Sequence, residues 1–251
     1  MYESSVPRYC PPLWLRNGHL QSIWPTLFRR VATMDPVPEV LATPDNDELH
    51  LDWYRQGSQR LAVVSHGLEG HSRRSYVLGL TRALLQEGWD VLAWNFRSCG
   101  GVMNHQPRFY HSGATGDLDR VVKHGLGKGD KTAFLSGFSM GGNLTLVYLG
   151  ERGTAVDPRI SGAAVFSVPC DLAASAEQLA RRANRFYMKR FIEELRVKME
   201  QKHEVYPDLI KLDGVESMRT FREFDDQFTA PLHGFRDAED YWYRCSSRST
   251  S

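Results

Sequence analysis

The sequence predicts an α/β fold built on a mostly parallel sheet. Between residues 61 and 167, short apolar strand patterns alternate with helix-like spacing, which is typical of parallel strands joined by covering helices. A hairpin pattern precedes this region, and a helical pattern follows it from residue 173 to about residue 206. The chain has 251 residues, of which 41% are hydrophobic, so it can bury one large core.

The elements follow from local patterns. Residues 39–43 and 48–54 flank the turn-prone segment Pro44–Asp47, which predicts the hairpin. The apolar runs and helical spacings that follow predict strands at 61–65, 90–96, 131–136 and 160–167, and helices at 76–87, 115–124 and 139–151. Only four parallel strands are recognisable, which is a short series for such a fold.

One domain is expected to span residues 1–251. Residues 1–38 are punctuated by proline and rich in apolar side chains, so we interpret them as a segment that wraps a sheet edge. Residues 173–244 are interpreted as a helical cap and its return to the core, because apolar residues recur every four positions from Leu179 to Met199. This helical segment is rich in lysine and arginine. Basic amphipathic helices can lie on membranes, which is one interpretation of the segment. A lid with a charged outer face is the favoured interpretation.

Composition narrows the function classes. The net charge of +1 supplies no basic field for nucleic acid. The start of the chain, residues 1–10, lacks the pattern of a secretion signal, and no apolar run is long enough for a membrane span. The four cysteines are scattered, which favours reduced thiols. The cysteines are Cys10, Cys99, Cys170 and Cys245. Reduced thiols and the lack of a secretion signal together predict a cytoplasmic protein.

The strongest motif surrounds Ser139. Gly137 and Gly141 flank it in a G-x-S-x-G pattern that follows an apolar strand and opens a helix. This context is typical of a nucleophile elbow, in which a serine hydroxyl is exposed on a strained strand-to-helix turn. The alternative is a serine that merely occupies a turn. The motif predicts acyl-transfer chemistry with Ser139 as the catalytic nucleophile.

A second candidate segment, residues 65–70, directly follows the 61–65 strand. A His-Gly turn there would place backbone amides beside the nucleophile. The backbone N–H groups of Leu68 and Met140 are the expected oxyanion donors, because such donors stabilise the charge that develops on a carbonyl oxygen. His66 could instead be a general base, although its position at a strand end favours a structural role.

Other patterns indicate no further site. His105 and His111 with Cys99 match no common metal spacing, so we expect no metal. The segment Asp45–Asp47 lacks the remaining ligands of a calcium loop and is interpreted as a turn. No nucleotide-binding pattern is present, and the chemistry of an activated serine requires no cofactor.

Several stretches together resemble the YheT-like family of α/β-hydrolases. They span almost the whole chain in the expected order and include 17–21, 66–70, 95–101, 107–118, 137–143, 169–172, 224–226 and 234–241. The resemblance implies an α/β-hydrolase fold with a helical cap and an esterase- or lipase-type activity. It also implies Ser139 as nucleophile and Leu68 and Met140 as oxyanion donors.

The chain departs from the family pattern at its C-terminal end. In the family, two further strands carry the triad aspartate and histidine, in the order serine, acid, histidine. No residue here can be matched to either, so we expect a truncated member in which the 160–167 strand becomes an apolar edge open to self-association. His203 and His233 are expected to face solvent or pack in the cap, with His233 the weaker alternative as a substitute base.

The expected function is hydrolysis of a small-molecule carboxylic ester with an apolar acyl group. The cap, which is rich in aromatic and aliphatic residues, favours the apolar substrate. A catalytically inactive remnant that only binds is the competing hypothesis. Transfer of the acyl group to an acceptor other than water is a third. The acidic residues of the cap return are expected to cap helices or to pair with nearby arginines, and these residues are Asp225, Asp226, Asp237 and Asp240.

Overall fold

The computed structural model describes residues 10–32, 34–129 and 131–250, and its internal contacts divide the chain into two units, 1–33 and 34–251. In the first unit, a 3₁₀ turn at Leu13–Leu15 precedes helix α1, Gly18–Phe28. Asn17 caps this helix by accepting a hydrogen bond from the His19 amide. The wrapping role expected for residues 1–38 stays a prediction. Residues 1–9, whose sequence lacks the pattern of a secretion signal, lie outside the described residues.

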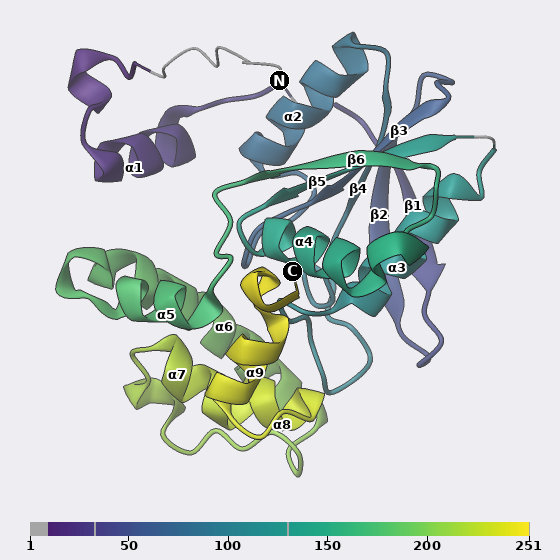
Figure 1. Cartoon of the computed structure of the whole chain (residues 1–251). Coiled ribbons are helices and arrows are strands. Elements are labelled where there is room, and N and C mark those ends of the chain that lie inside the picture. The colour runs from purple at the N-terminus through teal and green to yellow at the C-terminus, as the bar shows by residue number, and fades with distance from the viewer. Residues whose placement is uncertain (1–9, 33, 130, 251) are drawn as a thin grey trace. The chain divides into compact units, whose positions relative to one another are not determined.

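The second unit is built on a six-stranded sheet (Figure 1). Its strand order is β1-β2-β4-β3-β5-β6. The first two strands form the predicted hairpin, β2 pairs antiparallel with β4, and the remaining pairs are parallel. Each predicted strand is confirmed, with bounds of Val37–Ala42, Glu48–Tyr54, Arg60–Ser65, Asp90–Trp94, Thr132–Phe138 and Ile160–Phe166 for β1 to β6.

Three helices connect the parallel strands and cover the sheet. They are α2 (Ser75–Gln86), α3 (Thr115–Leu126) and α4 (Met140–Arg152), as predicted to within one or two residues. The chain moves from β3 to β4 in one direction and then back past β3 to β5. Right-handed crossovers therefore place α2 on one face and α3 and α4 on the other. The direction in which successive strands are added to the sheet reverses between β3 and β5. Ligands of open α/β sheets bind at such a switch point.

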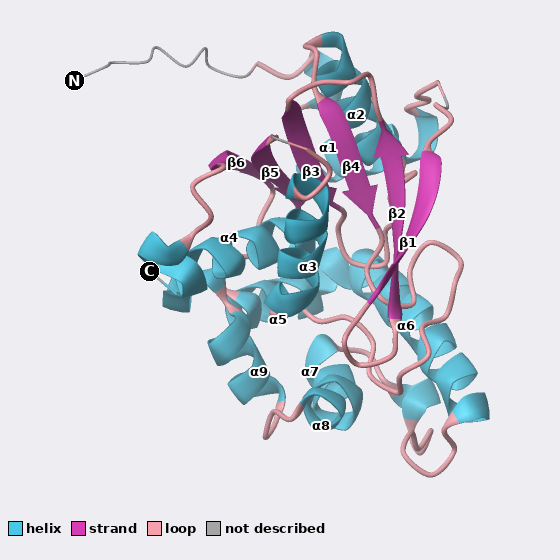
Figure 2. Ribbon diagram, turned by 90° about the vertical axis from the view of Figure 1, so that its right-hand side faces the viewer, coloured by secondary structure: helices cyan, strands magenta, loops and turns pink. Residues whose placement is uncertain are grey.

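A helical cap follows β6 and lies at the carboxyl ends of the parallel strands (Figures 1 and 2). The prediction of a single helical stretch from residue 173 to about residue 206 is wrong. The helix ends before Arg181, which has an extended backbone with a ψ of 147°. The Asn184 amide group donates to the carbonyl of Gln178 and satisfies a free group at this helix end. The cap helices are α5 (Leu172–Ala180), α6 (Arg185–Val205), α7 (Phe221–Phe224), a π-helix (Asp225–Thr229), α8 (Ala230–His233) and α9 (Ala238–Cys245). Short 3₁₀ turns lie at Gly153–Ala155, Arg182–Asn184, Val215–Ser217 and Ser247–Thr250.

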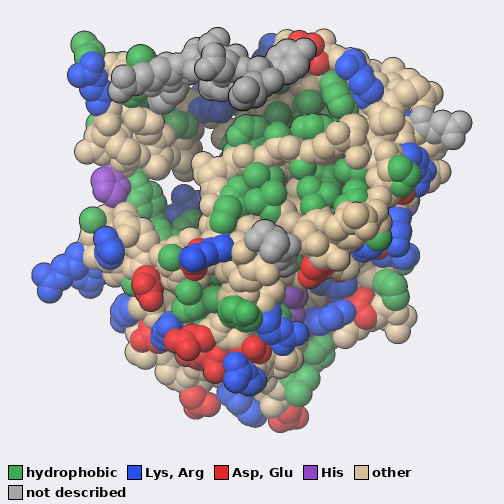
Figure 3. Space-filling view, viewed as in Figure 1, with side chains coloured by type: hydrophobic (Ala, Val, Ile, Leu, Met, Phe, Trp, Pro, Cys, Tyr) green, Lys and Arg blue, Asp and Glu red, His purple; other side chains and the backbone are tan. Residues whose placement is uncertain are grey.

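Among the described strands, β6 lies at the edge of the sheet and pairs only with β5, as predicted. Its pattern of exposure leaves both faces partly open, and Phe166 is 42% exposed. Hydrophobic side chains are visible along this part of the molecule (Figure 3). Self-association through the edge stays a prediction. Within the described chain, no helix is long and apolar enough to cross a membrane.

Candidate active site

Ser139 sits between the end of β5 and the start of α4. Its φ of 51° and ψ of −118° are rarely adopted by residues other than glycine. The motif glycines are required by close packing. A Cβ on Gly137 would lie 2.3 Å from the carbonyl oxygen of Gly141, and a Cβ on Gly141 would lie 2.3 Å from that of His66. The local geometry is therefore that of a strained strand-to-helix elbow.

The neighbouring strand β3 brings the second candidate segment to the elbow. Ser65 is in register with Gly137, so residues 66–68 run beside Ser139. Leu68, Ser139 and Met140 all line one cavity. Within the described residues, the N–H groups of Leu68 and Met140 make no hydrogen bond. Met140 is also the first residue of α4, where unpaired amides and the helix dipole favour a negative charge.

His66 is a buried connection between two strand ends. Its Nδ1 lies 2.7 Å from the carbonyl of Gly67, and its Nε2 accepts a hydrogen bond of 3.1 Å from the Phe96 amide. Burial lowers the pKa of His66 to about 3, so the ring is neutral, with its proton on Nδ1. Both nitrogens are engaged by the backbone, which supports a structural role and argues against His66 as the general base.

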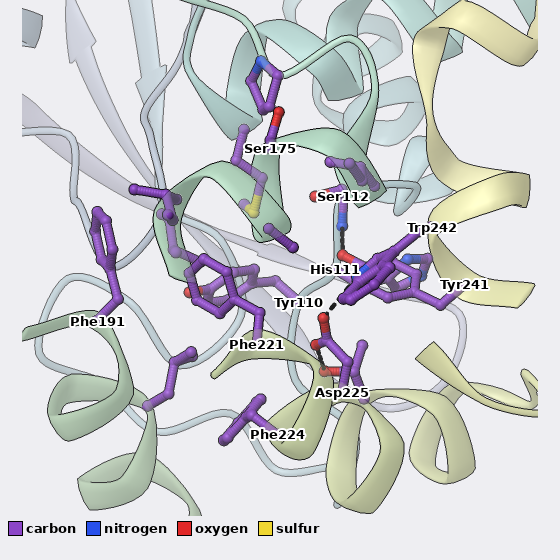
Figure 4. A pocket seen from close by; sticks show the side chains of 18 of the residues that line it. Tyr110, His111, Ser112, Ser175, Phe191, Phe221, Phe224, Asp225, Tyr241 and Trp242 are labelled. Atoms are coloured by element: carbon purple, nitrogen blue, oxygen red, sulfur yellow. Dashed lines mark hydrogen bonds between the residues drawn. The ribbon is translucent and has the colours of Figure 1, made fainter. Parts of the chain in front are cut away.

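The cavity under the cap is small and mostly apolar. Its volume is about 140 Å³, and Tyr110, Phe221 and Phe224 are among the residues that line it (Figure 4). The remaining lining comes from the loops after β3, β4 and β6, the elbow, the π-helix and the helices α5, α6 and α9. An apolar cavity of about 150 Å³ in another protein accommodates benzene. The site can therefore hold a small apolar group beside the Ser139 hydroxyl.

Asp225 is a functional candidate that the sequence did not reveal. It lines the cavity from the π-helix and is 8% exposed. Its carboxylate accepts hydrogen bonds from Thr229 Oγ1 at 2.6 Å and Trp242 Nε1 at 2.8 Å (Figure 4). Burial raises the pKa of Asp225 to about 7. The expectation that Asp225 caps a helix or pairs with an arginine is therefore wrong.

The other acidic residues of the cap return follow the expectation. Asp237 caps α9 by accepting a hydrogen bond from the Asp240 amide. Asp240 lies 3.5 Å from Arg236 and 3.4 Å from Arg244. Asp226 accepts a hydrogen bond of 2.7 Å from the Ala238 amide, the first residue of α9. These carboxylates therefore cap α9 or pair with arginines at the surface of the cap.

The histidines near the cavity come from two segments. His111, in the loop before α3, lines the cavity with Ser139. His233, in α8, is absent from that lining and packs against His111, with ring centroids 4.5 Å apart and ring planes tilted by 52°. Burial lowers the pKa of His233 to about 3 and that of His111 well below its usual value. The Nδ1 atom of His203 lies 2.6 Å from the carbonyl oxygen of Ile210. His203 packs in the cap through this contact and His233 through its contact with His111, as expected.

Asn143 connects the elbow helix to the end of the cap. Its amide group donates to the carbonyl oxygens of Cys245 at 2.7 Å and Ser112 at 3.3 Å, and its carbonyl oxygen accepts from the Ser247 amide. The Tyr241 hydroxyl accepts a hydrogen bond from the Ser112 amide. These bonds hold α9 against the wall of the cavity. The fully buried Asn143 follows the serine motif by two residues, and nothing in the sequence marks its partners.

The sequence predicts neither a metal site nor a disulfide, and the structure describes residues 10–32, 34–129 and 131–250. Within them, no three or more histidine, cysteine or acidic side chains gather to hold a metal ion. All four cysteines are free thiols. Cys99 lies beside Lys198, whereas His111 lies beside Cys245, so the three residues His105, His111 and Cys99 form no cluster.

Comparisons with known proteins identify the family to which this chain is similar. A family model described as "Serine aminopeptidase, S33" matches residues 56–215. An Escherichia coli (strain K12) protein named "Putative esterase YheT" is 35% identical over 254 residues, which cover 97% of this chain and 73% of the relative. The protein named "Phospholipase ABHD3" from Mus musculus is 30% identical over 249 residues, which cover 93% of this chain but only 59% of the relative.

A solved structure gives the same fold. The crystallised Pyrococcus furiosus esterase matches with a TM-score of 0.51 and 23% identity, covering 66% of this chain and 65% of that chain. At this level of identity the likeness supports the fold alone. The family match and the E. coli relative carry the assignment further. The chain therefore has the α/β-hydrolase fold and belongs to the YheT-like, esterase- and lipase-type family of α/β-hydrolases.

Proposed function

We propose that this protein is a serine hydrolase that cleaves carboxylic esters through an acyl-enzyme on Ser139. The observation that carries the proposal is the strained elbow of Ser139 beside the unpaired amides of Leu68 and Met140. A serine whose hydroxyl faces a cavity next to free backbone donors is the arrangement that acyl transfer requires. The names of the relatives, esterase and phospholipase, are consistent with it.

The reaction would run in two steps. The Ser139 hydroxyl attacks the ester carbonyl, a base accepts its proton, and the Leu68 and Met140 amides hold the oxyanion. The alcohol then leaves with a proton, and water hydrolyses the acyl-enzyme to release the acid. None of these steps calls for a cofactor.

The cavity sets the expected substrate class. Its lining is mostly aromatic and aliphatic, and its volume of about 140 Å³ suits a short or compact apolar acyl group. A longer chain would need the cap to move. We therefore propose small-molecule esters with an apolar acyl group as substrates, with the shortest acyl chains favoured.

A second candidate function is binding without turnover. Within the described residues, no histidine is hydrogen-bonded to the Ser139 hydroxyl. His111 lines the same cavity, but its Nδ1 already accepts a hydrogen bond from the Gly113 amide at 3.2 Å. Without a base, a serine hydrolase loses most of its rate. A protein of this kind would retain the cavity and bind an apolar ligand.

Ester turnover separates the two functions. We expect the purified chain to hydrolyse p-nitrophenyl acetate and butyrate faster than the octanoate. The kcat of the Ser139→Ala variant should be lower by up to about 10⁶-fold, as it is in another serine hydrolase without its serine.

A His111→Ala variant examines whether the His111 ring supplies the base. Equal rates for wild type and Ser139→Ala would refute the serine mechanism, and saturable butyrate binding without turnover would support the binding function. Added methanol that yields methyl ester in place of acid would indicate acyl transfer.

A further inference from the structure

The turn that carries Leu68 has a conformation that its sequence does not favour. The Gly70 amide donates to the Gly67 carbonyl at 2.9 Å, which closes a four-residue turn with Leu68 and Glu69 at its centre. Glu69 has a φ of 49°. Turns with a positive φ at the third residue favour glycine or asparagine there. Interactions outside the turn must therefore hold Glu69 in place.

Tyrosine hydroxyls supply part of that support. The Tyr110 hydroxyl accepts a hydrogen bond from the Glu69 amide at 3.3 Å and donates one to the Glu69 carboxylate. The Tyr76 hydroxyl accepts a bond of 3.0 Å from the Gly67 amide. Both rings come from outside the turn. The backbone and the side chain of Glu69 are thus fixed by the same hydroxyl group.

Lys198 supplies the remaining support from the cap. Its Nζ lies 2.7 Å from Glu69 Oε1 and 4.5 Å from the centre of the Tyr110 ring. The side chains of Lys198 and Glu69 are 6% and 11% exposed, so water screens their attraction little. Removing the lysine would leave a buried carboxylate without its counter-ion.

We propose that Lys198 is a positioning residue through which the cap helix α6 holds the Gly67–Gly70 turn, which we call the oxyanion turn. Its ammonium group fixes the Glu69 carboxylate, and the fixed Glu69 keeps the adjacent Leu68 amide beside Ser139. A cap that swings away would break this ion pair and release the turn. Closure of the cap over a substrate would therefore complete the oxyanion site. This inference deepens the proposed function and rests on it.

A second buried lysine on α6 provides a contrast. Lys202 is 1% exposed and donates to the carbonyl oxygens of Asn104, at 3.2 Å, and Gln106. It anchors the cap to the loop after β4 and makes no contact with the Gly67–Gly70 turn among its hydrogen bonds. Loss of Lys202 should weaken the attachment of the cap while leaving the turn in place.

The decisive experiment compares Lys198→Met, Glu69→Gly and the double variant in p-nitrophenyl butyrate hydrolysis. We expect Lys198→Met to lower kcat about 10- to 100-fold, less than the loss of an oxyanion donor, with KM changed less than about threefold. Glycine adopts a positive φ without support. Glu69→Gly should therefore restore kcat in the Lys198→Met background to within about fivefold of wild type.

Two lysine controls separate positioning from general packing. Lys189→Met removes an exposed lysine of the same helix and should leave kcat within about twofold of wild type, because exposed pairs contribute little. Lys202→Met should lower the melting temperature without the kcat loss of Lys198→Met. The proposal is wrong if Lys198→Met retains wild-type kcat, or if the folded double variant is as slow as Lys198→Met.

Hydrogen exchange makes the turn measurable even without turnover. The Glu69 and Gly70 amides are hydrogen-bonded in the turn, so their exchange should accelerate at least about tenfold in Lys198→Met. A wild-type chain without esterase activity would refute the proposed function. Unchanged exchange in Lys198→Met would refute the positioning role, whether or not the wild type is active.

Discussion

Two turns lie side by side at the carboxyl ends of β3 and β5, and they are stabilised in different ways. Each contains a residue other than glycine with a positive φ, 49° at Glu69 and 51° at Ser139. The elbow is held by its own neighbours, since Gly137 and Gly141 allow backbone to pack directly on backbone. The oxyanion turn is held by Tyr110 and Lys198, which lie 41 and 129 positions away from Glu69.

The difference explains why one turn could be recognised in the sequence and the other could not. A geometry that is set by adjacent residues leaves a local pattern of residue types. A geometry that depends on distant side chains leaves none, because tyrosine and lysine are common and their partners are fixed only by the fold. The elbow should therefore be rigid and intolerant of substitution, whereas the oxyanion turn should respond to movement of the cap.

Substitution of an elbow glycine should have the largest effect. In Gly137→Ala the new Cβ would lie 2.3 to 2.6 Å from backbone atoms of Gly141 and Gly142, which cannot move away as a flexible side chain could. We expect the free energy of unfolding to fall by more than about 3 kcal/mol, at or above the usual range for overpacking. Urea denaturation would measure the loss.

The matched control for that substitution is Gly116→Ala. Gly116 lies in α3, and a Cβ there meets no atom within 4 Å. Alanine favours a helix, so this variant should be more stable by about 0.5–1 kcal/mol. A Gly137→Ala variant as stable as Gly116→Ala would contradict the account of a locally held elbow.

The buried carboxyl of Asp225, in the wall of the cavity, should give a smaller and pH-dependent effect. Its pKa is about 7 in the folded state and 3.8 in the unfolded state. Between these values the folded state binds more protons, so stability falls as the pH rises. At pH 8, ionising the buried Asp225 carboxyl lowers the free energy of unfolding by at most about 4 kcal/mol. Asp225→Asn should recover roughly half of it, about 2 kcal/mol, because the amide must also be desolvated.

Thermal or urea unfolding at pH 5 and pH 8 would measure this gain. We expect Asp225→Asn to exceed wild-type stability at pH 8 and to differ little from it at pH 5. Asp208→Asn is the control, since the Asp208 side chain is fully exposed and its substitution should change the free energy of unfolding by no more than about 0.5 kcal/mol. A gain of the same size at both pH values would show that Asp225 does not titrate in the folded protein.

Most of the fold could be predicted because its elements carry local patterns. Strands β3 to β6 are apolar runs between turn signals, and α3 buries Leu118, Val121 and Val122 at helical spacing. The motif around Ser139 then placed the elbow between β5 and α4, and the β3–β5 register brought Leu68 beside it.

The rest depends on tertiary contacts. The break after α5 depends on Asn184 reaching back to Gln178, and a four-residue apolar repeat continues through it without interruption. Asp225 could be expected to pair with arginine because its sequence neighbours are charged. The π-helix instead directs the Asp225 carboxylate inward, where it accepts a hydrogen bond from Trp242, 17 positions later in the chain. Periodicity and composition do not report such contacts.

The most direct test of the central claim is the intact mass of the protein after treatment with a fluorophosphonate probe. Such probes phosphonylate a serine only where it is activated as a nucleophile. We predict a single adduct on the wild-type chain and none on Ser139→Ala, with slower labelling of Lys198→Met than of Lys189→Met. A folded wild-type protein that takes up no probe would contradict the account, because the elbow would then hold an unreactive serine.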